Sequence, residues 1–443
     1  MVPPHTPQVS TTASLRRELG KWDLTAIGIN QVIGAAVFAL PAALAASAGA
    51  WSPWLVAGVG LASMMIAVSF AEVGSRFEGT GGPYLYTRAA FGRFAAFEVG
   101  WLLWFTRAAS WASVINVLAT SLGFYWPGLT SGAPRAILIT LVIATITLIN
   151  IRGIRQSSFV INVLTVGKLA PLIIFIAIGV FYIQPGLFSY SLSPNMGPSM
   201  GQLSTAALLL IFAYGGYETV PVPAGEARDP RRAVPFALIM TIVVVAAVMT
   251  LVQIVAIGTL PGLATSRTPL ADAAGLFIGA GGAALMTVGA VLSTTGNNMG
   301  QALSGPRNLF ALAEQGDLPP WFGRIHPAFR TPVNSILFTA GVSLVLALSG
   351  TFVAMAAASA ISRLLVYVAT CASTIRLRDP RFAGRVNPAT FVVPFGPAIP
   401  LAAILISLAI LFGATTLQLT AGLGAIIAGA VLYVIAVRGQ RRV

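Results

Sequence analysis

Apolar residues occur in runs of about 20 along the 443-residue chain, and short polar segments separate the runs. A helix of this length crosses the hydrocarbon core of a bilayer, so the pattern predicts about twelve transmembrane helices. The predicted spans are roughly 23–47, 52–75, 95–121, 134–151, 158–183, 203–225, 233–259, 282–312, 333–349, 351–374, 392–412 and 416–437.

The composition agrees with this pattern. Hydrophobic residues make up 56% of the chain and charged residues 9%, and the mean hydropathy is +0.86. Because soluble domains contain about 25% charged residues, the chain is expected to be an all-α polytopic membrane protein. The polar segment 1–19 is expected to be a disordered cytosolic tail. No cleaved signal peptide is expected.

The positions of the basic residues predict the orientation. The net charge is +14, and with the N-terminus inside, 20 of the 26 Lys and Arg residues fall in inner segments. The outer loops contain only Arg135 and Arg267. This bias places both termini in the cytoplasm. The charge then faces anionic lipid headgroups, and no nucleic-acid partner is expected.

The reactive side chains argue against several other classes. Cys371, His5 and His326 are the only cysteine and histidines, so no disulfide framework, metal site or cofactor is expected. An enzyme would need a nucleophile–base pair, which the sequence does not offer. No soluble run exceeds about 25 residues, which is too short for the output domain of a receptor. Nothing resembles the filter of a channel.

The first span contains a stretch that a plain lipid-crossing helix does not need. Residues 28–40 read GINQVIGAAVFAL, with two amides and a cluster of small residues inside an apolar run. Glycine destabilises a helix interior by about 1 kcal/mol relative to alanine, and buried amides need partners. The stretch predicts an interrupted helix whose freed backbone groups face a cavity.

A second interruption is predicted in span six. The sequence LLLIFAYGGYETVPVPAGEARDPRR has a Gly pair at Gly215–Gly216, followed by Pro221 and Pro223. Two interrupted spans five helices apart are typical of transporters built from inverted repeats. The repeats would occupy about 20–185 and 200–376 of a transporter core over 20–376, and 377–443 would add two helices and a short basic tail.

Four patches resemble the APC (amino acid–polyamine–organocation) superfamily of permeases, over nearly the whole chain. They are GINQVIGAAVFALP from Gly28; AEVGSRF from Ala71 with GGPYLY and AFG; FAYGGYE from Phe212 with EARDPRR; and LSTT from Leu292 with PRNLFALAEQGDLPPWF and HPAFRTP. The resemblance implies the leucine-transporter fold, with five-plus-five inverted repeats. It also implies alternating access of an amino acid or a related organic cation through the cytoplasmic (inner) membrane.

The resemblance also implies the substrate contacts. In the family, backbone N–H groups of the opened first helix hold the α-carboxylate, and nearby carbonyls hold the α-amino group. The matching donors are Gly34, Ala35 and Ala36, and the matching carbonyls are Val32, Ile33, Phe212, Ala213 and Gly215. An aromatic residue at Phe212, or alternatively Tyr214, would cover the substrate. The triplet here is Gly-Ala-Ala rather than the family's Gly-Ser/Thr-Gly, so the backbone donors remain, while the hydroxyl is lost and a methyl group is added.

Lys168 lies in the middle of span five and is one of only two lysines. A buried lysine, unlike an arginine, can lose its proton. In sodium-independent members of the family, a lysine at the matching position is thought to stand where related transporters bind sodium. It would here lie near Ser293 and Thr294. The hypothesis is a proton-coupling group, or a fixed charge in an exchanger; the alternative is a static or snorkelling lysine.

Other charged residues also fall within predicted spans. Arg107 could bind a substrate carboxylate or form a static pair with Glu218 or Glu98, and the static pair is favoured. Arg363 is expected to be structural. Glu218 is expected to stabilise the interrupted helix, and Glu226 to join a cytoplasmic gate with Arg228, Arg231 and Arg232.

The sequence therefore predicts a secondary active transporter for an amino acid, sodium-independent and proton-coupled, with a neutral substrate favoured. An exchanger of the same fold remains the alternative, as does a non-transporting amino-acid sensor.

Overall fold

The computed structural model describes residues 15–34, 36–123, 126–129, 131–188, 199–349, 352–412 and 416–440. Within these ranges the regular secondary structure is helical, with two isolated β-bridges and no strand. The predicted all-α class is therefore confirmed for the described part of the chain.

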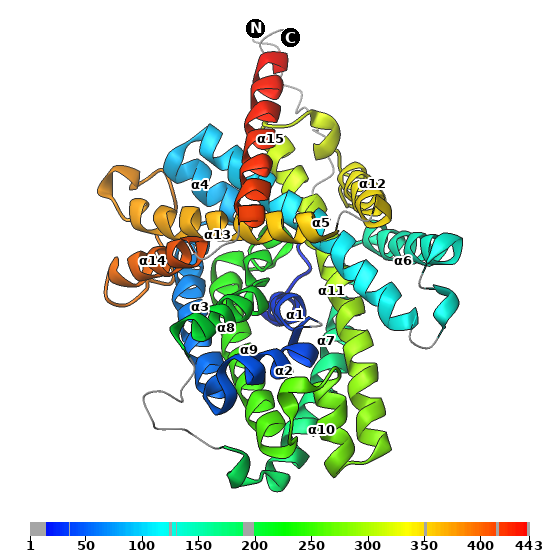
Figure 1. Ribbon diagram of the computed structural model, residues 1–443. Helices are drawn as coiled ribbons and strands as arrows, with labels where there is room; N and C mark the ends of the chain where they lie inside the picture. Colours follow the sequence, from blue (N-terminus) through cyan, green and yellow to red (C-terminus); the bar gives the residue numbers. More distant parts are fainter. Residues whose placement is uncertain are drawn as a thin grey trace, which may run out of the picture.

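The predicted apolar runs coincide with helices or with pairs of helices (Figure 1). In chain order the α-helices are α1 (Lys21–Val32), α2 (Ala36–Ala48), α3 (Ser52–Gly74), α4 (Pro83–Phe91), α5 (Arg93–Gly123), α6 (Gly132–Arg152), α7 (Ile154–Gly179), α8 (Met200–Tyr214), α9 (Pro230–Thr259), α10 (Pro269–Phe277), α11 (Ala280–Glu314), α12 (Val333–Ser349), α13 (Phe352–Arg376), α14 (Ala398–Phe412) and α15 (Thr416–Gln440). The short helices α4 and α10 lie in segments that were expected to be loops.

One boundary differs clearly from the prediction. The run predicted from residue 392 becomes helical only at Ala398. Phe395 has a φ of 60° and Gly396 a φ of 61°, and Pro397 follows. Left-handed backbone and a residue preceding proline are both incompatible with a continuing α-helix. The apolar residues before Ala398 therefore form a turn.

Some helices have membrane-crossing length and apolar character by themselves. Among the described residues these stretches are Ala36–Gly74, Gly132–Arg152, Ile154–Tyr182 and Pro230–Thr259. Shorter apolar helices occur at Val333–Ser349, Ala398–Phe412 and Gly422–Ile435. An apolar bundle of this kind is suited to a lipid environment.

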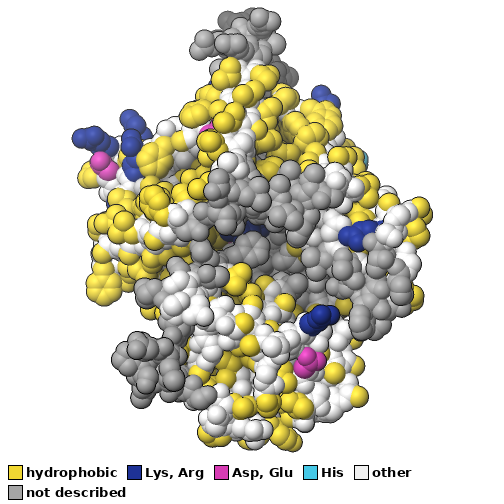
Figure 2. Space-filling view, in the orientation of Figure 1, with side chains coloured by type: hydrophobic (Ala, Val, Ile, Leu, Met, Phe, Trp, Pro, Cys, Tyr) yellow, Lys and Arg dark blue, Asp and Glu magenta, His cyan; other side chains and the backbone are white. Residues whose placement is uncertain are grey.

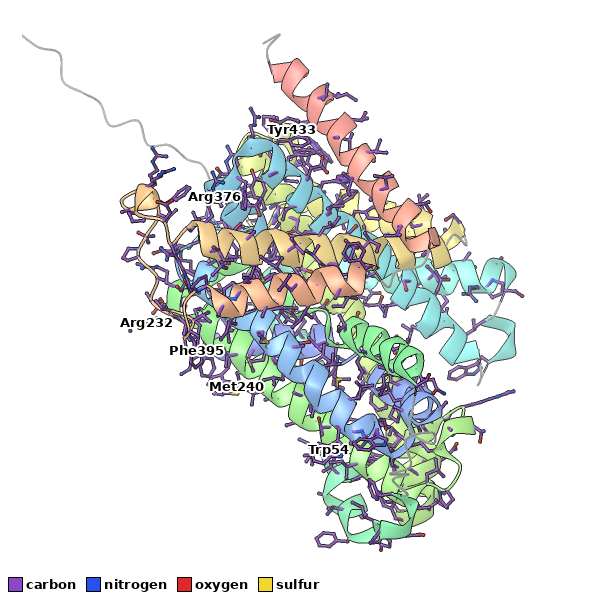
Figure 3. The ribbon with its side chains drawn as sticks, turned by 60° about the vertical axis from the view of Figure 1, so that its left-hand side comes forward. Trp54, Arg232, Met240, Arg376, Phe395 and Tyr433 are labelled. Atoms are coloured by element: carbon purple, nitrogen blue, oxygen red, sulfur yellow. The ribbon has the colours of Figure 1, made fainter. Side chains whose placement is uncertain are left out.

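Helix α1 lies at the centre of the bundle in Figure 1 and packs against α7, α9 and α11. Helix α3 packs against α8 and α9, and α5 packs against α11 and α13. Figure 3 shows α13 and α14 side by side, with α15 leaving the bundle at its upper end. The centre of the molecule is thus the broken end of α1 and the helices that hold it.

The two predicted interruptions meet in space. Helix α8 ends at Tyr214, and the chain continues through Gly216 into the short helix η5 (Tyr217–Thr219). Gly216 has a φ of 132°, and a Cβ there would lie 2.8 Å from the carbonyl carbon and oxygen of Gln31 in α1. A glycine is required at this position because both the backbone angle and the close approach exclude a side chain.

We expect the substitution Gly216→Ala to destabilise the protein and to abolish its activity. The strained backbone would cost about 1–3 kcal/mol, and the clash with the α1 backbone cannot be relieved by moving a side chain. The measurement is the thermal unfolding midpoint of the purified protein in detergent. Gly58→Ala in α3 is the matched control, because no atom lies within 4 Å of a Cβ at that position. An unchanged midpoint in Gly216→Ala would contradict this packing.

Candidate functional site

The amides of α1 bind the broken end of that helix to α11. Asn30 Nδ2 donates to the Gly296 carbonyl at 2.5 Å, and Gln31 Nε2 donates to the Asn297 carbonyl at 3.1 Å. In return, Asn297 Nδ2 donates to the Gln31 carbonyl at 3.0 Å. Buried amides are stable only with such partners. The polar residues within this apolar run therefore form hydrogen bonds that hold α1 against α11.

Lys168 of α7 reaches the freed carbonyl groups at the end of α1. Its Nζ donates to the carbonyls of Asn30 at 3.0 Å, Ile33 at 2.7 Å and Ser293 at 3.4 Å, and the side chain is fully buried. Ser293 Oγ also donates to the Ile33 carbonyl, at 3.0 Å. Thr294 instead bonds its hydroxyl to Ala290 of its own helix. Lys168 thus connects α7, the break in α1, and α11.

These hydrogen bonds use backbone groups that the family resemblance assigned to the substrate. The Ile33 carbonyl accepts from both Lys168 and Ser293, which uses its two lone pairs. The Gly34 N–H donates to the Val32 carbonyl at 2.9 Å. Ala36 is the first residue of α2, and Ala35 lies outside the described residues. The Ile33 carbonyl and the Gly34 N–H are thus already bonded within the protein.

The second interruption differs from the prediction at Tyr214. Its hydroxyl donates to the Val56 carbonyl at 3.0 Å, and its ring packs on Gly60, so the side chain faces α3 rather than the break in α1. Tyr214 is therefore not in a position to cover a substrate there. Ala213 is buried, and the side chain of Phe212, the other candidate, lies outside the described part of the chain.

Glu218, in the turn after α8, is the centre of a buried network. Its carboxylate lies 2.7 Å from Arg107 Nη2 and 2.9 Å from Arg363 Nε. It also accepts from the Tyr367 hydroxyl and the Gly216 N–H, both at 2.8 Å. A side chain on Gly215 would collide with the Arg363 guanidinium. The network therefore joins α5, α13 and the second interruption.

The favoured pairing of Arg107 is thus the one with Glu218. Glu98, the other candidate partner, faces α15 at Gly429, and its two carboxylate oxygens have no hydrogen-bond partner. Tyr367 was not predicted as part of this network. The only signal was a polar aromatic four residues after Arg363, which places both on one face of a helix.

The network predicted for Glu226 is wrong in its partners. Glu226 forms a fully buried ion pair with Arg307 of α11, not with the neighbouring arginines. Arg231 instead donates to the carbonyls of Ser75 and Pro388. The Glu226 carbonyl accepts from the backbone N–H groups of Glu18 and Leu19, so the segment before α1 is bound to the same point. The prediction chose the nearby arginines as partners because they are close in sequence. The buried side chain of Glu226 instead faces α11.

Two further ion-pair clusters were not predicted. Asp317 accepts from Tyr84, Arg88 and Arg93, which connects α4 and α5 to the end of α11. Glu72 of α3 pairs with Arg378, and this hydrogen bond raises the pKa of the Arg378 guanidinium. These clusters hold the ends of helices and are structural.

The central arrangement brings freed backbone groups and buried cations together. Two interrupted helices meet there, and buried cations stand beside their ends. The described residues contain no group of three His, Cys, Asp or Glu side chains that could hold a metal ion. The apolar bundle and its interrupted helices define a multi-pass membrane protein.

Comparison with known proteins agrees with this class. The model of the family described as "Amino acid permease" matches residues 19–437. The chain therefore belongs to this family, within the APC superfamily.

Three similar proteins, all from Bacillus subtilis, match most of the chain. A methylthioribose transporter is 27% identical over 413 residues, covering 88% of this chain and 87% of its own. A branched-chain amino acid permease is 27% identical over 451 residues, covering 95% and 93%. A serine/threonine exchanger is 28% identical over 399 residues, covering 88% and 89%.

We expect Arg307→Gln to destabilise the protein by about 3–5 kcal/mol, because it leaves the Glu226 carboxylate buried without a counter-charge. The control is Arg232→Gln, which removes an exposed pair 4.0 Å from Asp229 and should cost at most about 1 kcal/mol. Chemical unfolding in detergent would compare the two. The double variant Arg307→Gln/Glu226→Gln should be less destabilised than Arg307→Gln alone. Equal stability of the two single variants would contradict a structural role.

Proposed function

We propose that this permease is a secondary active transporter that moves an amino acid by alternating access, sodium-independent and coupled to protons. In this proposal it has two five-helix inverted repeats and two additional helices, lies in the inner membrane, and has both termini in the cytoplasm. Membership of the permease family and the meeting of two interrupted helices support it.

The position of Lys168 is the observation that most directly supports coupling of transport to protons. The ammonium group is held by three backbone carbonyls, and no acidic side chain in the described part of the chain forms an ion pair with it. Opened carbonyls of this kind commonly coordinate a small cation in transporters. A protonated lysine supplies one positive charge at the same kind of place, so a bound sodium ion is not needed.

Loss of the proton would also change how the helices are held together. The ammonium has three donors and binds the Asn30 and Ile33 carbonyls of α1 and the Ser293 carbonyl of α11. A neutral amine has only two donors and a weaker hold on these acceptors. Protonation therefore strengthens the attachment of the α1 break to α7 and α11, and deprotonation weakens it. This link between charge and helix attachment is what proton coupling requires.

A neutral amino acid is the proposed substrate. Arg107 is paired with Glu218 rather than left unengaged. Two of the relatives are named for branched-chain amino acids and for serine and threonine, which are neutral. The name of the serine/threonine exchanger also supports the second candidate, amino-acid exchange by the same fold, in which Lys168 would be a fixed charge.

The decisive experiment is uptake of labelled leucine, threonine and serine into liposomes containing the purified protein. We expect an inward proton gradient to drive accumulation and an inward sodium gradient to have no effect. Lys168→Ala should abolish accumulation. Uptake that needs internal unlabelled amino acid would instead identify an exchanger. Sodium-driven uptake would contradict the role given to Lys168.

A second variant separates the charge of Lys168 from its proton. Lys168→Arg keeps the positive charge but cannot release a proton at accessible pH. We expect it to retain substrate counterflow while losing proton-driven accumulation by at least about tenfold. Lys21→Arg, at the start of α1, is the matched control and should behave like the wild type. Full accumulation by Lys168→Arg would exclude this lysine as the coupling group.

A further inference from the structure

A cavity of about 370 Å³ lies between the segments that lead into α1 and α9, away from the two interruptions. Small-molecule sites in proteins commonly have volumes of about 300–1,000 Å³, so a small head group fits here. The two segments are paired through their backbones. The Arg228 N–H donates to the Leu19 carbonyl at 3.0 Å, and Leu19 is 1% exposed. Two stretches that are far apart in the sequence thus form the walls of one cavity.

The charge of this cavity is mainly positive. Lys21, Arg228 and Arg232 line it, and Asp229 is the one carboxylate among the lining residues. Asp229 lies 4.0 Å from Arg232 and both side chains are exposed, so this pairing is weak. In the described part of the chain no carboxylate forms an ion pair with Lys21 or Arg228. Residues 1–14 contain no acidic residue that could neutralise them.

Aromatic contacts hold these cations beside an apolar surface. Lys21 Nζ lies 4.7 Å from the centre of the Phe236 ring, so the ammonium group reaches from the start of α1 to α9. Trp22 packs edge-on against the same ring, with 5.0 Å between the ring centres, and is itself 60% exposed. An exposed tryptophan beside basic residues is typical of the membrane–water interface. We therefore expect the cavity to open at the level of the lipid headgroups.

An apolar face of α9 leads away from the cavity. Phe236, Met240 and Val243 lie four and three residues apart, so they share a helix face, and Val243 is 47% exposed. Figure 3 shows Arg232 and Met240 on the same side of the molecule. Helix α9 is also one of the stretches with the length and apolar character to cross a bilayer. A ligand with an anionic head and an acyl chain matches both parts of this surface.

We propose that this cavity binds the phosphate group of an anionic phospholipid from the surrounding bilayer. The phosphate oxygens accept from one ammonium and two guanidinium groups, which are strong charge-assisted hydrogen bonds. The acyl chain lies along the apolar face of α9, which a free phosphate ion could not use. Because Lys21 belongs to α1 while Arg228 and Arg232 flank the start of α9, one bound lipid joins the two helices. The inference does not depend on the transported substrate or on the role of Lys168.

The test measures binding of phosphatidylglycerol with brominated acyl chains to the purified full-length protein in detergent. Bromine quenches nearby tryptophans, and Trp22 is the exposed reporter beside the cavity. The signal of Trp22 is the difference between the wild type and Trp22→Phe. Brominated phosphatidylcholine has the same chains with a head group that carries no net charge. Glycerol 1-phosphate and inorganic phosphate, added as competitors, carry the phosphate without the chains.

Two triple variants remove the same amount of charge. The first acts on the cavity and is Lys21→Gln/Arg228→Gln/Arg232→Gln. The matched control is Arg152→Gln/Arg155→Gln/Arg324→Gln, three exposed arginines that form no ion pair within the described residues. All six side chains are exposed, so both variants should fold, and their thermal unfolding midpoints without lipid should match that of the wild type.

We expect the wild type to bind phosphatidylglycerol more tightly than phosphatidylcholine, with little competition from the two free phosphates. Each single substitution in the cavity should weaken binding of phosphatidylglycerol about fivefold, and the cavity triple variant about 100-fold. Binding of phosphatidylcholine should not change. The control triple variant should bind phosphatidylglycerol as the wild type does, because charges more than about 10 Å away are largely screened by salt.

Four outcomes would overturn the proposal. Equal affinity of the wild type for the two lipids would show that the cavity does not select an anionic head group. Equal losses in the two triple variants would assign the binding to the general surface charge. Glycerol 1-phosphate or inorganic phosphate that bound as tightly as the lipid would make this a site for a soluble phosphate. Quenching that was unchanged in Trp22→Phe would place the lipid elsewhere on the protein.

Discussion

The structure depends on how the backbone groups at the interruption of α1 are satisfied. Ending a helix inside an apolar bundle frees carbonyls that neither lipid nor water can serve, so the protein must supply donors. Lys168 and Ser293 donate to the Ile33 carbonyl, and Asn297 donates to the carbonyl of Gln31. Helices α7 and α11 are therefore attached to the break itself. Any movement of the α1 end has to exchange these bonds for others.

The buried ion pairs are of two kinds, which differ in the ratio of positive to negative side chains. Arg307 and Glu226 form a one-to-one pair without exposure, which fixes α11 against the chain that follows the second interruption. Glu218 instead faces two arginines, and part of Arg107 remains without acceptors. A bundle that only needed stability would be better served by balanced pairs or by apolar residues.

The family fixes the fold and the general activity of the protein but leaves its substrate open. Relatives of similar identity are named for a sugar derivative, for branched-chain amino acids and for serine and threonine. One family can thus serve different substrates. In this chain the buried polar groups are a cation held by carbonyls at the first interruption and an arginine network at the second.

The sequence by itself determined the features that depend on local composition. Long apolar runs fixed the helices, and glycine, proline and amides inside those runs located both interruptions, because such residues are costly in a plain membrane helix. Lys168 was recognisable because almost every other cation is an arginine. Only the tertiary structure decided which groups meet. Glu226 pairs with Arg307, 81 residues away, and Tyr214 turns toward α3. Such contacts follow from how helices pack, and the local pattern along one helix does not contain the positions of its neighbours.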